Sequence, residues 1–176
     1  MSSYNRSLYL RYADALRHPG HFSTAISEFF AKDANINVVH PFNEIQSADA
    51  FFLKFMAPLQ QAFEGLYRRD YIFMTGQFEG KDWISSTGYY VGRFAKDWIG
   101  IKATDTLCYL RYGEFHQVKN GKVVESYIYL DIPELMIACN EWPLKMGPGL
   151  SRGYTGLIQG PATRDGVIAK ASDPNE

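Results

Sequence analysis

Apolar residues recur at helical spacing in the first part of the chain and at every second position in the middle part. The helical spacing predicts helices over residues 7–17, 21–32 and 47–63, with a short alternating strand over 35–40. The period of two predicts strands over 71–75, 83–94, 107–118 and 122–130, before a closing helix over 132–142. Helices followed by consecutive antiparallel strands indicate an α+β domain, with helices packed on one face of a curved sheet.

Two local signals refine this outline. Pro58 lies inside the third helical segment and is expected to kink or divide it. Asn120-Gly121 predicts a tight hairpin turn, because a type I′ turn needs positive φ at both central positions. If Lys119 pairs with Lys122, alternation places five cross-strand pairs on one face of the hairpin. These pairs are Val118 with Val123, His116 with Glu125, Glu114 with Tyr127, Tyr112 with Tyr129, and Leu110 with Asp131.

This face combines aromatic and aliphatic side chains with four ionisable groups. If this face were solvated, its apolar side chains would be exposed to water. If it were a plain core, burying each ionisable group would cost several kcal/mol of free energy. A pocket lined by rings, with a few polar groups, accounts for both halves of the pattern. The chain holds 12 Tyr, 12 Phe and 3 Trp, which is enough to build such a ring-lined pocket.

The chemistry expected in this pocket is proton transfer. A carboxylate desolvated among tyrosine rings has a raised pKa and accepts protons near neutral pH. A histidine beside a carboxylate can donate to a developing oxyanion. Enolisation next to a carbonyl needs this pair in an apolar cavity and demands no metal or organic cofactor. We therefore expect Asp131 to be the catalytic base and His116 the catalytic donor.

Other residues are expected to contact an apolar or aromatic small-molecule substrate. They are His40, Asn43, Trp83, Glu114, Glu125, Tyr127 and Tyr129.

Several of these residues also have a structural interpretation. Asp131 and Glu134 have the spacing of a helix capping box, so Asp131 is a cap, a base, or both. His116 and Glu125 are also consistent with a plain cross-strand pair, and Glu114 with an acceptor for a tyrosine hydroxyl. His40 is also consistent with a hydrogen-bonded rim residue and Trp83 with a core residue. The basic pair at residues 68–69 is expected on a solvated face.

Charge and composition exclude several classes of protein. Lys and Arg total 18 and Asp and Glu total 19, so there is no positive field to hold a nucleic acid. Two cysteines cannot form a disulfide framework. No apolar run approaches the roughly 18 residues of a membrane span, and the first residues show no apolar signal segment. A cytoplasmic protein without membrane or nucleic-acid partners is the expectation.

Three segments resemble a known family. Residues 92–104, Gly-Arg-Phe-Ala-Lys-Asp-Trp-Ile-Gly-Ile-Lys-Ala-Thr, resemble the Gly-x-Phe run of SnoaL-like proteins that leads to Leu-Gly-Ile-Pro-Pro-Thr-Gly. Residues 118–125 with Asp131 resemble the family hairpin Asp-Gly-Lys-Ile-Val-Glu, followed by five residues and Asp. Residues 33–38 resemble the first-strand motif of the wider nuclear transport factor 2-like superfamily. The resemblance covers roughly residues 20–142.

The resemblance implies a cone-shaped α+β barrel in which a strongly curved antiparallel sheet and N-terminal helices enclose a pocket. It also implies a homodimer and a cofactor-free polyketide cyclase activity, an intramolecular aldol reaction. The acid/base Asp of the family corresponds to Asp131, and His116 is the nearest match to its assisting His. The sequence departs from the family at residues 103–105, Ala-Thr-Asp in place of Pro-Thr-Gly, and again after Asp131.

Two further functions compete with the enzyme. A non-catalytic small-molecule binder and a dimerisation module are both compatible with the same scaffold. The expected SnoaL-like domain spans residues 1–142. A Gly- and Pro-rich tail follows over 143–176 and is expected to wrap a dimer partner, cover the pocket mouth, or lead toward a second domain copy.

Overall fold

A computed structural model describes residues 2–18, 20–144 and 167–168 of the 176-residue chain. The helices are α1 (Ser2–Ala15), α2 (Phe22–Phe29), α3 (Ala48–Phe51), the π-helical turn η1 (Phe52–Met56), α4 (Ala57–Ala62) and α5 (Ile132–Ala138). The strands are β1 (Phe30–Val38), β2 (Asn43–Gln46), β3 (Phe63–Phe78), β4 (Lys81–Phe94), β5 (Leu107–Lys119), β6 (Lys122–Leu130) and β7 (Val167–Ile168).

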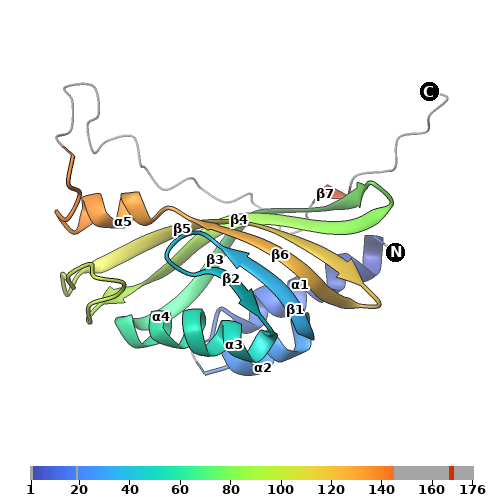
Figure 1. The fold of residues 1–176 in the computed structure, drawn as a ribbon, viewed down its shortest axis with the longest axis horizontal. Helices are drawn as coiled ribbons and strands as arrows, with labels where there is room; N and C mark the ends of the chain where they lie inside the picture. Colours follow the sequence, from blue (N-terminus) through green and yellow to red (C-terminus); the bar gives the residue numbers. More distant parts are fainter. Residues whose placement is uncertain (1, 19, 145–166, 169–176) are drawn as a thin grey trace.

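The strands form one curved, open sheet in the order β2-β1-β6-β5-β4-β3-β7. Helices α1 to α4 lie together beneath one face, the inner face, and α5 lies at one end of the sheet (Figure 1). The predicted α+β fold is thus confirmed. Most neighbouring strands are antiparallel, but β1 runs parallel to β6, and β7 runs parallel to β3. In the described part of the chain, no helix combines the length and apolar character needed to cross a membrane.

The helical region differs from the expected one at two points. The second helix ends at Phe29, because Phe30 already pairs with Val123 across the sheet and sheet pairing overrides the helical spacing. Strand β2, which the pattern did not predict, pairs with β1 as a short hairpin. Pro58 divides the third segment as expected. It stands in the first turn of α4, directly after the π-helical turn, where its missing N–H is tolerated.

The hairpin between β5 and β6 has the predicted turn. Asn120 and Gly121 both have positive φ, 51° and 77°, as a type I′ turn requires. Lys119 pairs with Lys122 and Val118 with Val123, also as predicted.

The predicted register fails beyond Val123. Gln117 pairs with Glu125 and His116 with Ser126, so β6 carries one extra residue, Val124, in a β-bulge. Because side chains alternate, one extra residue moves every later side chain of β6 to the other face. His116 and Glu114 stay on the inner face, while the side chains of residues 125, 127 and 129 turn to the outer face.

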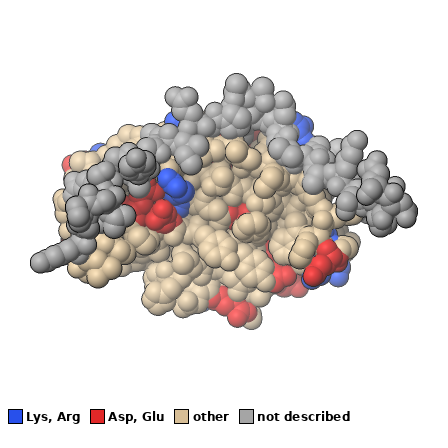
Figure 2. Space-filling view, turned by 90° about the horizontal axis from the view of Figure 1, so that it is seen from above, with Lys and Arg blue, Asp and Glu red and all other residues tan. Residues whose placement is uncertain are grey.

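The outer face of the sheet exposes large apolar side chains. Ile72, Met74 and Phe115 are each 47% exposed, and Tyr129 is 57% exposed. Figure 2 looks onto this face and shows few charged groups across its centre. A surface with several exposed apolar side chains and few charges is typical of one that binds another molecule.

Two glycines on neighbouring strands have opposite surroundings. A Cβ added to Gly88 would meet the Arg69 carbonyl and would lie 2.6 Å from the Tyr112 hydroxyl and 2.9 Å from Asp70 Cα. The same atom on Gly113 would meet nothing within 4 Å. Because Gly88 has no side chain, the Tyr112 side chain can lie across β4 on the inner face and reach Asp70 on β3.

We predict that Gly88→Ala lowers the free energy of unfolding by about 1–3 kcal/mol through overpacking. Gly113→Ala should leave it unchanged or raise it by up to about 1 kcal/mol, since alanine loses less backbone entropy. Urea denaturation of both variants tests this pair. Equal effects of the two substitutions would contradict the packing described for Gly88.

Candidate functional site

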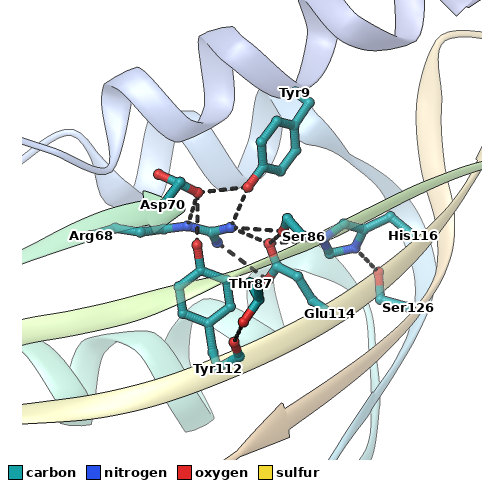
Figure 3. A network of polar contacts seen from close by, with 9 residues as sticks. All are labelled: Tyr9, Arg68, Asp70, Ser86, Thr87, Tyr112, Glu114, His116 and Ser126. Carbon is teal, nitrogen blue, oxygen red and sulfur yellow. Dashed lines mark hydrogen bonds and ion pairs between the residues drawn. The ribbon is translucent and has the colours of Figure 1, made fainter. Parts of the chain in front are cut away.

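A buried arginine occupies the centre of the inner face (Figure 3). Arg68 is fully buried on β3, whereas Arg69 is exposed, so the prediction that both lie on a solvated face is wrong for Arg68. Strand alternation is the reason, because it turns neighbouring side chains to opposite faces. The Arg68 guanidinium donates from Nε to Asp70 Oδ1 (2.9 Å) and from both terminal nitrogens to the Glu114 carboxylate.

Hydroxyl groups complete the shell around these charges. Arg68 Nη2 also donates to the Tyr9 hydroxyl at 2.9 Å. Asp70 Oδ1 accepts from the hydroxyls of Tyr9 (2.6 Å) and Tyr112 (2.7 Å). The Ser86 hydroxyl donates to Glu114 Oε1 at 2.8 Å.

His116 lies next to Glu114 on β5. Its Nδ1 is 2.7 Å from the Ser126 hydroxyl, and its Nε2 is 3.2 Å from Glu114 Oε1 without hydrogen-bond alignment. The imidazole makes T-shaped contacts with two phenylalanine rings. The distance between ring centroids is 5.1 Å for Phe29 and 5.9 Å for Phe30. The ring is thus held at one nitrogen, and the other nitrogen faces a carboxylate.

We call these eight residues the Arg68 cluster. They come from α1 and from four adjacent strands: Tyr9, Arg68, Asp70, Ser86, Tyr112, Glu114, His116 and Ser126.

Both carboxylates of the cluster are held in the charged form. Burial by itself would raise the pKa of Glu114, but the Arg68 charge, the nearby His116 and the hydrogen bonds from Arg68 outweigh it and hold the pKa well below its usual value. Burial opposes ionisation of Asp70 in the same way. Arg68 and the tyrosine hydroxyls again prevail and lower the Asp70 pKa. Glu114 is therefore a fixed negative charge beside His116, and not the raised-pKa base expected of a desolvated carboxylate.

The structure separates the two predicted catalytic residues. Asp131 follows β6 beyond the bulge and caps α5, accepting from the Glu134 backbone N–H at 3.0 Å. The interpretation of Asp131 as a helix N-cap is confirmed, although the reciprocal bond of a capping box is replaced, since the Asp131 N–H donates to the Arg111 carbonyl oxygen. The ionic neighbours of this region are Glu134 and Arg111, which lie 3.6 Å apart, and burial raises the pKa of Glu134. His116 instead meets Glu114. The two residues lie at different positions along the hairpin, since His116 pairs with Ser126 and Asp131 follows the end of β6, and their catalytic roles stay predictions.

The other predicted substrate contacts are dispersed. On the outer face, Tyr127 donates to Glu125 at 2.7 Å and stacks near Trp83, at 6.5 Å between centroids. His40 and Asn43 lie exposed at the turn between β1 and β2. Of the predicted site residues, the inner face holds only His116 and Glu114.

The surroundings of the cluster are closed. Hollows lined by described residues lie between α1 and α2, beside Trp98, and along β1 and β2, and His116 lines none of these three. Arg68 and His116 are fully buried, so a substrate reaches them only if side chains move. Within the described ranges, no three His, Cys, Asp or Glu side chains are grouped as metal ligands.

The sequence analysis placed Tyr112 on the face of His116 and Glu114. It missed the other members of this cluster, which are Arg68, Asp70, Tyr9, Ser86 and Ser126. A signal for two of them was present, since Leu66, Arg68 and Asp70 alternate at the start of β3 and share its inner face. Nothing in the sequence predicts that Tyr9 joins the cluster, because it lies on α1, 61 residues before Asp70 in the chain.

Solved structures share this fold. A provisionally assigned SnoaL-like polyketide cyclase from Jannaschia sp. CCS1 superposes with a TM-score of 0.65 at 17% identity, covering 81% of this chain and 94% of its own. AclR, a provisionally assigned hydroxylase from Streptomyces galilaeus, gives 0.64 at 19% identity, covering 83% and 87%. A nuclear transport factor 2-like protein from Burkholderia thailandensis E264 gives 0.57 at 18% identity, covering 76% and 93%. No protein-family model and no curated protein matches the chain.

The cluster makes stability depend on pH. Because the folded-state pKa of Glu114 and Asp70 is lowered, their contribution is complete above their ordinary values of 4.5 and 3.8 and is lost as the pH falls below them. We predict that the free energy of unfolding drops between pH 5 and pH 3, and that Glu114→Gln makes this drop shallower by up to about 1.4 kcal/mol per pH unit.

At pH 7, Glu114→Gln should cost about 3–5 kcal/mol, since it leaves a buried guanidinium with one carboxylate. Urea titrations at several pH values measure both effects. Glu79→Gln, in the exposed turn after β3, is the control. A wild-type acid slope retained in Glu114→Gln would show that Glu114 does not carry it.

Proposed function

We propose that this chain, which has the fold of SnoaL-like and nuclear transport factor 2-like proteins, is an enzyme that transfers a proton at an uncharged carbonyl compound. One observation supports this most directly. The imidazole of His116 is fixed by Ser126 on one side and faces the ionised Glu114 on the other, in an aromatic interior.

Each group has a role that follows from its charge. Glu114 stays ionised and stabilises the imidazolium that forms when His116 accepts a proton. Arg68 and Asp70 hold Glu114 in place and are positioning residues. His116 then returns the proton to the substrate oxygen, so that a carbonyl compound becomes an enol. This step consumes no cofactor, since the proton only moves between carbon, imidazole and oxygen.

The charge balance favours an uncharged substrate. Asp70 and Glu114 together carry two negative charges against one on Arg68, whose donors are already engaged. An anionic substrate would therefore gain little from Arg68. The surrounding rings favour an apolar or aromatic body. Because the cluster is enclosed, the proposal requires α1, which supplies Tyr9, to move aside when substrate binds.

The provisional assignment of the Jannaschia protein as a polyketide cyclase supports this type of reaction, whereas AclR is assigned as a hydroxylase. The role predicted for Asp131 as base remains a separate proposal. It would place the reaction at the end of β6, beside Glu134 and Arg111.

A non-catalytic interaction module is the second candidate. The complete burial of Arg68 and His116 favours it, because a cluster closed to solvent can serve stability alone. In that case the outer face of the sheet would carry the function.

We predict that the protein accelerates deuterium uptake from D₂O at the α-carbon of 1-tetralone, an uncharged aromatic ketone, followed by proton NMR. His116→Gln should lower this rate by about 10²–10⁴-fold, since it removes the group that carries the proton. Asp131→Asn should stay close to wild type. His18→Gln, at an exposed histidine, is the control.

A folded His116→Gln variant with the wild-type rate would overturn the proposal. Loss of activity in Asp131→Asn alone would assign the reaction to Asp131. Exchange no faster than in buffer would favour the interaction module.

The outer face supports a further part of the proposal, a homodimer. Stable interfaces bury about 800 Å² per partner around an apolar centre. The exposed side chains of Ile72, Met74, Phe115 and Tyr129 form such a centre. A second copy would cover the same residues by two-fold symmetry.

We predict that the protein sediments at twice its chain mass of 20.0 kDa and that Phe115→Glu, which places a charge in the apolar centre, shifts it to the monomer. Gln61→Glu, in the exposed part of α4 on the helical side, is the matched control. Analytical ultracentrifugation measures both. A monomeric wild type, or a dimer unaffected by Phe115→Glu, would contradict this interface.

A further inference from the structure

A separate hollow lies between α1, α2 and the β5–β6 turn. Its volume is about 250 Å³. Its lining comes from three elements: Tyr4, Leu8, Arg11 and Tyr12 of α1, Ala25, Glu28 and Phe29 of α2, and Gly121 and Lys122 of the turn. None of these residues belongs to the Arg68 cluster.

The floor of the hollow is apolar and contains two aromatic rings. The rings of Tyr12 and Phe29 stack with centroids 4.0 Å apart and planes inclined by only 6°. Leu8 and Ala25 extend this apolar floor, and all four side chains are buried, so their positions are fixed by packing. Because the two rings cover one face of each other, an apolar group in the hollow would meet their remaining surface together with Leu8 and Ala25.

The rim is positively charged. Arg11 is exposed, and the Lys122 ammonium donates to the backbone carbonyl oxygens of Ser27 and Glu28 at the end of α2. The Glu28 carboxylate is the one negative group of the lining. Two cations against one carboxylate leave a net positive charge.

We propose that this hollow binds a small aromatic molecule that carries one negative charge, with the ring against the apolar floor and the charge toward Arg11. The volume lies just below that of ordinary ligand pockets, about 300–1,000 Å³, which limits the bound part to a small ring system. The floor also forms one wall of the Arg68 cluster, since Phe29 contacts His116 and the Tyr12 ring centroid lies 5.2 Å from Arg68 Cζ. This inference does not depend on the proposed proton transfer.

Two fluorescent probes test the site. 1-Anilinonaphthalene-8-sulfonate carries the ring system and a negative charge, and N-phenyl-1-naphthylamine is its uncharged counterpart. Arg11→Gln should lower the affinity for the sulfonate probe by about two- to fivefold, as expected for an exposed charge pair. The affinity for the neutral probe should stay unchanged. Lys81→Gln, an exposed lysine at the start of β4, is the matched control and should affect neither probe.

Filling the hollow with larger side chains should prevent the binding of both probes. Leu8→Trp and, independently, Ala25→Leu place new side-chain volume on the floor and should each weaken both probes at least tenfold, with circular dichroism showing that the variants are folded. Undiminished binding to both folded variants would place the probes elsewhere, for example on the outer face. An equal response of the two probes to Arg11→Gln, or the absence of binding to the wild type, would also overturn the proposal.

Discussion

A buried guanidinium sets the arrangement of the inner face. Arg68 reaches Tyr9 on α1, Ser86 on β4 and Glu114 on β5, so one side chain ties a helix to three strands. A charge this deep in the interior is tolerated only where counter-charges and hydrogen bonds compensate its lost hydration. The two carboxylates and the hydroxyl groups supply that compensation. The positions of the side chains around Arg68 are therefore strongly coupled.

The same constraint shapes the candidate chemistry. Glu114 is a very weak base because Arg68 lowers its pKa, so proton transfer in this interior is assigned to His116. The cluster thus couples a structural requirement, compensation of a buried charge, to an electrostatic one, a permanent anion beside an imidazole. The separate hollow above Tyr12 and Phe29 has the opposite charge and a different ligand preference.

The single extra residue in β6 explains why the later side chains of this strand lie on the opposite face from the predicted one. Alternation correctly placed His116 and Glu114 together, because both lie on one strand and need no partner to define their face. The placement of Tyr127 and Asp131 depended on pairing between two strands. A bulge at Val124 changes that pairing and leaves no clear trace in local sequence.

The sequence alone determined the class of fold, most of the helices and strands in their order, the turn at Asn120-Gly121 and the candidate cap at Asp131, because propensity, alternation and turn chemistry act over a few residues. Only the tertiary structure decided that Arg68 lies in the interior, that Tyr9 meets Asp70, and that the ionisable groups of the hairpin divide between two faces. These outcomes depend on contacts between residues far apart in the chain, whose energies exceed local preferences and are set by the packing of the whole sheet.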